Sequence, residues 1–272
     1  MELKELQQMI QANKVKAIDL KYCGLDGKWY HITVPVRNIL EVMENGIPFD
    51  GSSIPGMRSV ESGDMVLMPD SKTAHLESFY ETPTLRMICS ICDAETRLGV
   101  KKDPRSVALR AHNYLLSTGI ADMSTWIPEL EFHLFDSVQY CSDSFSAGYN
   151  ITSSECKEAL PDDNEDPGSL SLQGVKGYHI DTPFDQFYEI RQKIVELIEE
   201  QDIKVRYHHH EVGISAQEEI ETELLAFPKI CDDVMIMKDI IRKTALQYGL
   251  TATFMPKPVF GHAGNGMHFH IM

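Results

Sequence analysis

The segment Pro128-Glu-Leu-Glu-Phe-His-Leu-Phe135 alternates between apolar and polar residues, which is the pattern of a β-strand with one buried face. Because successive side chains of a strand point to opposite faces, the leucines and Phe132 face the core, while Glu129, Glu131 and His133 share the other face. Strand rise separates the two carboxylates by about 7 Å, a span that one or two cations could neutralise. An exposed strand face with ordinary acidic residues is an equally good interpretation of this segment alone.

A second group of carboxylates and histidines lies in Tyr207-His-His-His-Glu-Val-Gly213 and at Glu219. Adjacent histidines of a strand alternate faces, so His208, His209 and His210 cannot all bind one ion. Most of them are better interpreted as core residues or as residues that hold carboxylates in place. Glu211 and Glu219 are the better candidates for metal ligands.

A glycine-rich loop, 261–266, precedes the run Met267-His-Phe-His-Ile-Met272, in which His268 and His270 face the same way. Glycine-rich loops let backbone N–H groups approach an anion or a substrate, although these glycines could equally be simple turn residues.

Together the three segments place a set of carboxylates and one histidine at predicted strand ends: Glu129, Glu131, Glu211, Glu219 and His268. Sites rich in carboxylates select hard cations such as Mg²⁺ or Mn²⁺. Four carboxylates exceed the charge of one divalent ion, which indicates two ions, and pairs of cations commonly act on nucleotide phosphates. Zinc is disfavoured because the spacing of Cys and His fits no zinc site.

Composition excludes several classes of protein. The 272 residues carry 25 basic and 41 acidic side chains, a net charge of −16, which disfavours binding to nucleic acid. No apolar run is long enough to span a membrane, and the first residues do not resemble a signal peptide. The six scattered cysteines indicate a reduced, cytoplasmic protein.

The pattern of apolar residues predicts an α+β fold with two domains, 1–103 and 104–272, separated where Lys101-Lys-Asp-Pro104 opens a helix. In the first domain we expect a mixed or antiparallel sheet; the expected helices are 2–14 and 36–45, and the expected strands are 16–23, 29–36, 65–68 and 84–93. In the second we expect helices 104–118, 183–201 and 228–249, strands 126–136, 203–212, 251–255 and 266–272, and a long loop over 141–177. Because the last residues read as a strand without a partner, we expect the chain to be the front portion of a longer protein.

In this order the segments resemble bacterial and archaeal-type glutamine synthetase. The matching stretches are Phe49-Asp-Gly-Ser-Ser-Ile54, Asp64-Met-Val-Leu-Met-Pro-Asp70, Pro128-Glu-Leu-Glu-Phe132, Lys176-Gly-Tyr178, His208-His-His-Glu-Val212, Thr251-Ala-Thr-Phe-Met-Pro-Lys-Pro258 and Gly266-Met-His-Phe-His270. The resemblance covers essentially the whole chain. It implies an N-terminal β-grasp domain and a partial catalytic domain, an antiparallel half-barrel with flanking helices that lacks the family's C-terminal third.

The resemblance also implies an activity, the ATP-dependent ligation of ammonia to the γ-carboxylate of L-glutamate through γ-glutamyl phosphate. Two or more Mg²⁺ or Mn²⁺ ions would assist, and the enzyme would be a cytoplasmic ring, a homododecamer with active sites between subunits, which binds neither nucleic acid nor membrane. Glu131, Glu211 and Glu219 would hold one ion, and Glu129 and His268 would help to hold the other.

Further roles follow from the same resemblance. Asp50, Ser53, Tyr178 and Glu211 would form an ammonium pocket, with Asp50 and Glu211 as catalytic residues and Asp50 supplied by a neighbouring subunit. The glutamate loop would include Ala263 and Gly264, and the nucleotide would lie near Arg206, Leu224 and His270.

The chain departs from the family at several of these positions. Ala263 replaces the usual asparagine of the glutamate loop, and Ala216 replaces the usual glycine. By the same resemblance, Leu224 stands at a position that is often aromatic against the adenine, and Arg206 at one that often contacts the nucleotide. Two alternatives to glutamine synthetase therefore stay open: a ligase that joins glutamate to a larger amine, and a catalytically inactive or truncated subunit that binds metal without turnover.

Overall fold

A computed structural model describes residues 1–59, 63–155, 177–213 and 216–272. By its internal contacts the chain divides into two units, one made of residues 1–123 and 227–232 and the other of residues 124–226 and 233–272. The predicted boundary between two domains at residue 103 stays a prediction, because the two units are defined by their internal contacts and not by independent folding.

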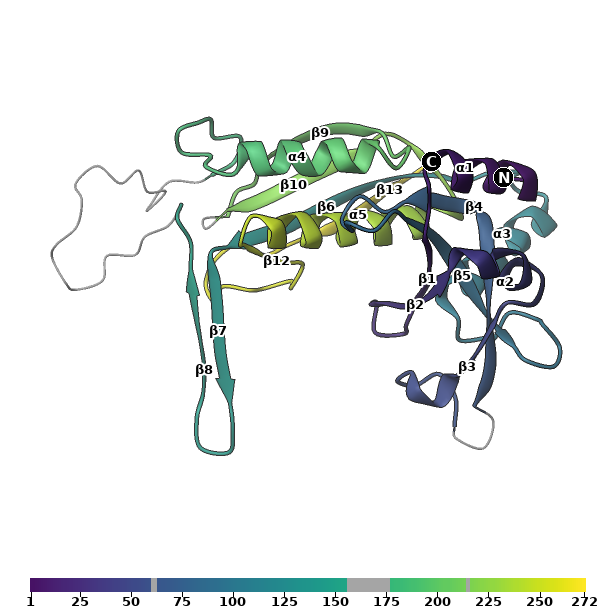
Figure 1. The fold of residues 1–272 in the computed structure, drawn as a ribbon. Coiled ribbons are helices and arrows are strands. Elements are labelled where there is room, and N and C mark those ends of the chain that lie inside the picture. Colours follow the sequence, from purple (N-terminus) through teal and green to yellow (C-terminus); the bar gives the residue numbers. More distant parts are fainter. Residues whose placement is uncertain (60–62, 156–176, 214–215) are drawn as a thin grey trace, which may run out of the picture. The chain divides into compact units, whose positions relative to one another are not determined.

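Unit 1 contains a five-stranded sheet in the order β2-β1-β5-β4-β3 (Figure 1). The strands are β1 (Ala17–Cys23), β2 (Trp29–Pro35), β3 (Ile47–Asp50), β4 (Asp64–Leu76) and β5 (Thr84–Asp93). Strands β1 and β5 are parallel and the other pairs are antiparallel, so the predicted mixed sheet is confirmed. Strand β4 extends well beyond the predicted range 65–68, because its pairing with β5 shifts register between Asp70 and His75 and then resumes.

The described part of unit 1 includes the complete helices α1 (Leu3–Ala12), α2 (Ile39–Asn45) and α3 (Pro104–Thr118). Leu6 of α1 and Val42 of α2 are buried in the core with Ile18, Leu67 and Met87 of the sheet. Apolar residues at alternate strand positions and on one stripe of each helix thus produce the β-grasp arrangement.

Unit 2 is built on the long strand β6 (Thr125–Phe135). On one side β6 pairs with β10 (Gln217–Thr222) and β11 (Leu225–Ala226), and β10 pairs in turn with β9 (Val205–His210). On the other side β6 pairs with β12 (Thr251–Thr253) and β13 (Met267–Ile271). All these pairs are antiparallel, as expected for a half-barrel, and the α+β fold is confirmed.

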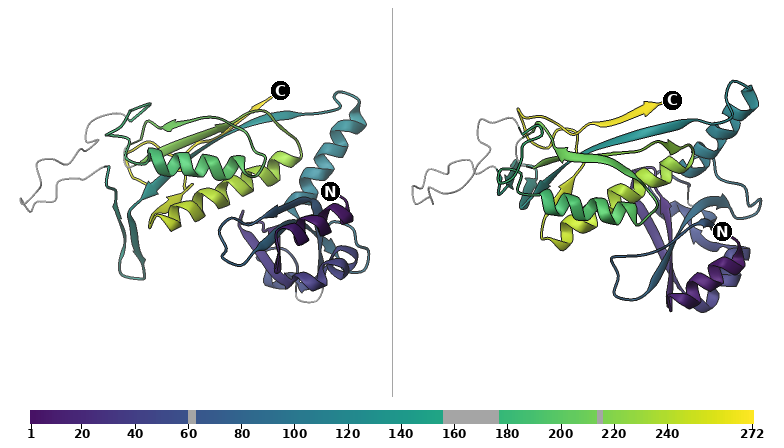
Figure 2. Two further views of the ribbon diagram at one scale, coloured as in Figure 1. Left: turned by 45° about the horizontal axis from the view of Figure 1, so that its top comes forward. Right: turned by 90° about the horizontal axis from the view of Figure 1, so that it is seen from above.

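Helices α4 (Tyr188–Glu199) and α5 (Lys229–Gln247) run along one face of this sheet (Figure 2). We call it the helix face, and it includes Leu130, Phe132, Leu134 and Ile220, all fully buried. The opposite face, which we call the front face, carries the alternate residues of the same strands. No helix in the described part of the chain is long and apolar enough to cross a membrane.

Two predictions for unit 2 were wrong. The loop expected over 141–177 contains most of a hairpin, β7 (Ser137–Ser142) and β8 (Ala147–Thr152). Its residues are nearly all exposed, and the apolar alternation of its strands is short and interrupted by Ser, Asp and Gly residues typical of loops. Residues 156–176 lie outside the described part. The helix expected from Pro183 begins only at Tyr188, because residues 183–187 form a turn and an approach to the helix.

The start of α3 gives a first prediction. Asp103 is fully buried and its carboxylate accepts hydrogen bonds from the Ser106 backbone N–H at 2.9 Å and the Ser106 hydroxyl at 2.6 Å. We expect Asp103→Ala to lower the free energy of unfolding by about 1–2 kcal/mol, because the helix loses its N-cap. Asp103→Asn keeps an acceptor oxygen and should cost less. Urea unfolding measures both, and equal losses would contradict capping as the cause.

Candidate metal centre and its supporting network

The predicted metal ligands of three strands meet on the front face. Glu131 lies opposite Glu219 and Glu129 opposite Glu221 in the pairing of β6 with β10. On the other side of β6, Glu129 lies opposite His268. Because residues directly opposite on neighbouring strands are about 5 Å apart, the strand register alone crowds these carboxylates together.

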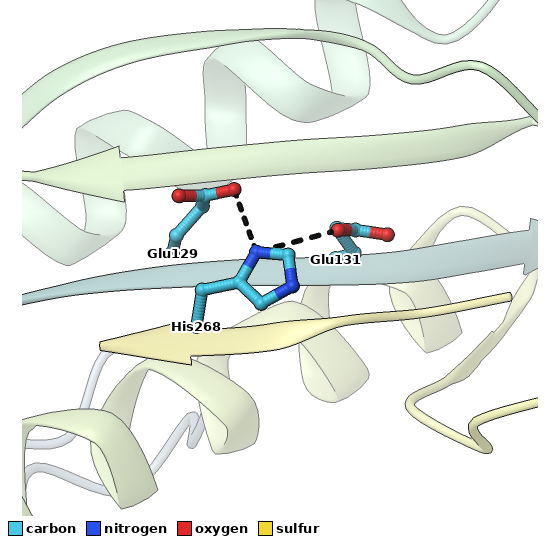
Figure 3. A group of neighbouring side chains, drawn as sticks. All are labelled: Glu129, Glu131 and His268. Atoms are coloured by element: carbon cyan, nitrogen blue, oxygen red, sulfur yellow. Dashed lines mark hydrogen bonds and ion pairs between the residues drawn. The ribbon is translucent and has the colours of Figure 1, made fainter. Parts of the chain in front are cut away.

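His268 joins the two glutamates of β6 (Figure 3). Its Nδ1 atom is 2.9 Å from Glu129 Oε1 and 3.9 Å from Glu131 Oε1. His270 Nε2 lies 3.1 Å from the second oxygen of Glu129. The sequence-based prediction that His268 and His270 share a face is therefore confirmed.

A second group lies beside the first and consists of His209, Glu211 and Glu219. His209 Nε2 is 3.3 Å from Glu219 Oε1, and Glu211 follows the end of β9, where its backbone N–H donates to the Gln217 carbonyl at 2.7 Å. Each group presents three donor atoms that lie within 4.8 Å of one another. The five predicted ligands thus fall into two neighbouring groups, with Glu131 and Glu219 facing each other across β6 and β10.

The carboxylates differ in how the protein compensates their charge. Burial alone would raise the pKa of Glu129, but hydrogen bonds from His268 and His270 outweigh it and lower that pKa. Burial raises the pKa of Glu131, and the charges of Glu211 and Glu129 raise it further. Burial and the charge of Glu219 likewise raise the pKa of Glu211. Glu131 and Glu211 therefore carry charge that a cation would stabilise.

The glycine-rich loop closes on this group of carboxylates. A Cβ atom at Gly266 would lie 2.5 Å from Glu131 Oε1 and 2.7 Å from His268 Nε2, so glycine lets these two side chains approach the loop backbone. Gly264 is more strictly constrained, because a Cβ atom there would overlap the backbone carbonyl oxygen of Pro256. The oxygen-rich donor set that converges beside Gly266 fits a hard divalent cation.

Gln217 is a site residue that sequence reasoning missed. Its amide nitrogen donates to Glu131 Oε2 at 2.8 Å and to the Gly264 carbonyl at 3.0 Å, and its amide oxygen accepts from the Gly213 N–H at 2.7 Å. Gln217 therefore ties the glycine-rich loop to a candidate ligand. The signal was its spacing of two residues from Glu219, which places both on one face of a strand.

The other predicted site residues lie at several places. Arg206 is ion-paired to Glu221 at 2.8 Å, the exposed Leu224 follows β10, and the half-buried Ala263 lies in the loop. Tyr178 stacks on His179 at 4.0 Å and meets the edge of His209 at 5.4 Å between ring centroids, so it lies beside the second group.

Asp50 and Ser53 belong to unit 1. The Asp50 carboxylate accepts hydrogen bonds from the Ser52 N–H at 2.9 Å and the Ser53 hydroxyl at 3.3 Å. Hydrogen bonds from Ser52 and then Ser53 lower the pKa of Asp50, which favours the ionised carboxylate.

A network of charged residues on the helix face lies behind this centre. Arg191 of α4 contacts Asp185, Glu218 and His208, while His210 Nε2 lies 3.0 Å from Glu155 Oε2. The prediction that His208 and His210 face away from His209 is confirmed. Burial lowers the pKa of His210, but Glu155 and Glu218 outweigh it and raise that pKa to about 9.

His208 provides a prediction about pH. Its Nδ1 accepts a hydrogen bond from Arg191 Nε at 2.9 Å, so the ring is neutral. Burial and then the Arg191 charge lower the pKa of His208 to about 4, below its unfolded value near 6.5. The neutral ring therefore stabilises the fold above pH 6.5, and this contribution is lost as the pH falls from 6.5 through about 4.

We expect His208→Gln, which still offers an acceptor, to remove part of this acid sensitivity. Between pH 7 and pH 4 the unmodified chain should lose about 1–2 kcal/mol more unfolding free energy than the variant, a value reduced for partial exposure of the ring. Urea unfolding at several pH values measures the difference. Parallel curves for the two proteins would contradict a neutral His208.

Comparisons with known proteins show the family to which the chain belongs. Residues 14–94 match the family profile described as glutamine synthetase, beta-Grasp domain, and residues 101–272 match glutamine synthetase, catalytic domain. The chain is 41% identical over 266 residues to glutamine synthetase of Azotobacter vinelandii and 40% identical over 267 residues to that of Pseudomonas aeruginosa. Each alignment covers 97% of this chain and 57% of the relative, so the chain spans little more than half the length of these proteins.

A solved structure gives the same result. The cryo-EM structure of Plasmodium falciparum glutamine synthetase has a TM-score of 0.89 and 29% sequence identity, with 100% of this chain and 53% of that chain covered. The catalytic-domain profile alone matches more than half of the sequence. The chain belongs to the glutamine synthetase family.

Proposed function

We propose that the chain supplies the front portion of a glutamine synthetase active site, which ligates ammonia to the γ-carboxylate of L-glutamate at the expense of ATP. The observation that carries this proposal is the meeting of Glu129, Glu131 and His268 with Glu211 and Glu219 on one sheet face. Family membership supports the same reaction, glutamine formation.

The front-face carboxylates are proposed to hold divalent metal, Mg²⁺ or Mn²⁺. Glu131, Glu211 and Glu219 would hold one ion, and Glu129 with His268 would help to hold a second. The support is the donor set, the close approach of Glu131 and His268 to Gly266, and the neighbouring carboxylate charge that raises the pKa of Glu131 and Glu211. When bound, such ions neutralise phosphate oxygens during phosphoryl transfer.

The proposed reaction has two steps. A γ-carboxylate oxygen of glutamate attacks the γ-phosphorus of ATP, which forms γ-glutamyl phosphate and releases ADP. Ammonia then attacks the acyl carbon, phosphate leaves, and glutamine forms. Ammonium must lose a proton before the attack, and the ionised Asp50 is the proposed acceptor.

The remaining substrate contacts are proposals as well. Ser53, Tyr178 and Glu211 would complete the ammonium pocket around Asp50. Glutamate would lie against the loop at Ala263 and Gly264, and ATP near three residues: Arg206, Leu224 and His270. From membership of the family we also propose a cytoplasmic ring of identical subunits, a homododecamer, in which Asp50 is supplied to a neighbouring subunit's site.

The reaction can be tested by mixing the chain with ATP, glutamate, Mg²⁺ and ammonia. The proposal predicts phosphate release that requires both glutamate and ammonia. Preference for methylamine over ammonia would favour the ligase of a larger amine, and metal binding without turnover would favour an inactive subunit.

Glu131→Gln tests the metal assignment. The amide keeps the shape of the side chain and its contact with Gln217 but removes the charge shared by the two groups. We expect at least a tenfold loss of Mn²⁺ affinity by isothermal titration calorimetry and loss of any metal-dependent turnover. Unchanged Mn²⁺ binding would remove Glu131 from the metal site.

Gly266→Ala tests the space beside the carboxylates. Its methyl group would displace Glu131 or His268, so we expect Mn²⁺ affinity to fall about tenfold. The matched control is Gly148→Ala in the exposed hairpin, where a Cβ atom meets nothing within 4 Å. Equal Mn²⁺ binding by the two variants would argue against a site at Gly266.

A further inference from the structure

The helix face behind the candidate metal centre carries buried charge where apolar packing is expected. Asp185, Arg191 and Glu218 are 5%, 2% and 0% exposed, and Glu155 and His210 are fully buried. Each of these groups is linked to Arg191 or to His210 by a hydrogen bond or ion pair. We call these five residues and His208 the helix-face network.

Arg191 is the centre of this network. Its Nη1 and Nη2 atoms hold the two oxygens of Asp185 at 3.2 and 2.7 Å, Nη1 also contacts Glu218 Oε2, and Nε donates to His208 Nδ1 at 2.9 Å. All three guanidinium nitrogens are therefore engaged. A lysine could not reproduce this arrangement, because its single ammonium lacks the planar fork.

Stability alone does not account for such a network. Burying several charges has a large desolvation cost, and replacing buried ion pairs by well-packed apolar residues is often neutral or stabilising. A role in specifying one arrangement of the strands is the alternative, and the local sequences of β9 and β10 show where it is needed.

The local sequences of β9 and β10 do not decide which of their side chains lie on the front face. Strand β10 has adjacent glutamates, Glu218 and Glu219, and β9 ends in three consecutive histidines. Because side chains alternate, a slip of one residue in either strand would exchange the residues on the two faces. Polar residues on both faces mean that apolar burial does little to penalise this slip.

Arg191 removes the ambiguity in both strands at once. It holds Glu218 of β10 and His208 of β9 on the helix face. The next residues, Glu219 and His209, then point to the front face, where they lie opposite each other in the register and 3.3 Å apart.

We propose that Arg191 is a positioning residue that selects Glu219 and His209 for the front face and so assembles the metal centre from behind. The inference rests on the proposed function only in that the front-face carboxylates bind a divalent cation.

Arg191→Lys is the main test, with Mn²⁺ alone as the probe. The substitution keeps a positive charge but loses the fork that joins Glu218 to His208. We expect the Kd for Mn²⁺, measured from the free-ion EPR signal, to rise about tenfold in protein that circular dichroism shows to be folded. Unchanged Mn²⁺ affinity would overturn the proposal.

Ile194→Val is the matched control. Ile194 lies one turn further along α4 and is fully buried, so its substitution should lower the thermal midpoint without touching the charged groups. We expect its Mn²⁺ affinity to be unchanged. An equal loss of affinity in both variants would mean that Arg191 only stabilises the fold, and would overturn the proposal.

Two further variants complete the test. In the Glu219→Gln background, Arg191→Lys should cause little additional loss of Mn²⁺ affinity, because Arg191 acts through Glu219. Fully additive losses of affinity would contradict this.

If Arg191→Lys does not fold, the triple variant Arg191→Met, Asp185→Asn, Glu218→Gln removes the charges that would be left unpaired. We expect this variant to fold with weakened Mn²⁺ binding. Binding at full affinity by that variant would also overturn the proposal, whereas failure of the unmodified chain to bind Mn²⁺ would instead reject the metal centre itself.

Discussion

Mutual repulsion of carboxylates on the front face of the unit 2 sheet is the constraint on which the rest of that unit depends. The register of β6 with β10 sets Glu131 against Glu219 and Glu129 against Glu221, and like charges directly opposite destabilise a sheet. Histidines from β13 compensate Glu129. Glu131 and Glu211 retain charge that the neighbouring carboxylates oppose, which is the condition that a divalent cation relieves.

The fold supports this charged face from three directions. The apolar residues of β6 fix the strand against the helices, Gln217 ties the glycine-rich loop to Glu131, and Arg191 holds the helix face of β9 and β10. Each support acts on a different strand or loop, so the centre is assembled from segments far apart in the sequence. Glycine at position 266 then lets Glu131 and His268 lie close to the loop backbone.

How far the sequence predicts this arrangement depends on where apolar burial decides the structure. Strand β6 could be predicted because one of its faces is wholly apolar, and the same alternation predicted the facing of its glutamates and of the histidines in β9 and β13. Strand β10 has a single apolar residue, Ile220, and its buried Glu218 is compensated by an arginine from a helix, which no local pattern reveals. The β7–β8 hairpin has an apolar face formed by Val138, Tyr140, Tyr149 and Ile151, but that face is mostly exposed, and the Ser, Asp and Gly residues around it resemble a loop.

We propose that carboxylates from separate strands form one metal centre on the front face. Anomalous scattering from crystals of the chain soaked in Mn²⁺ would locate the bound ions. We expect anomalous peaks coordinated by Glu131 with Glu211 and Glu219, and by Glu129 with His268. Peaks confined to other acidic groups, such as Glu155 with Asp185 and Glu218, would contradict it.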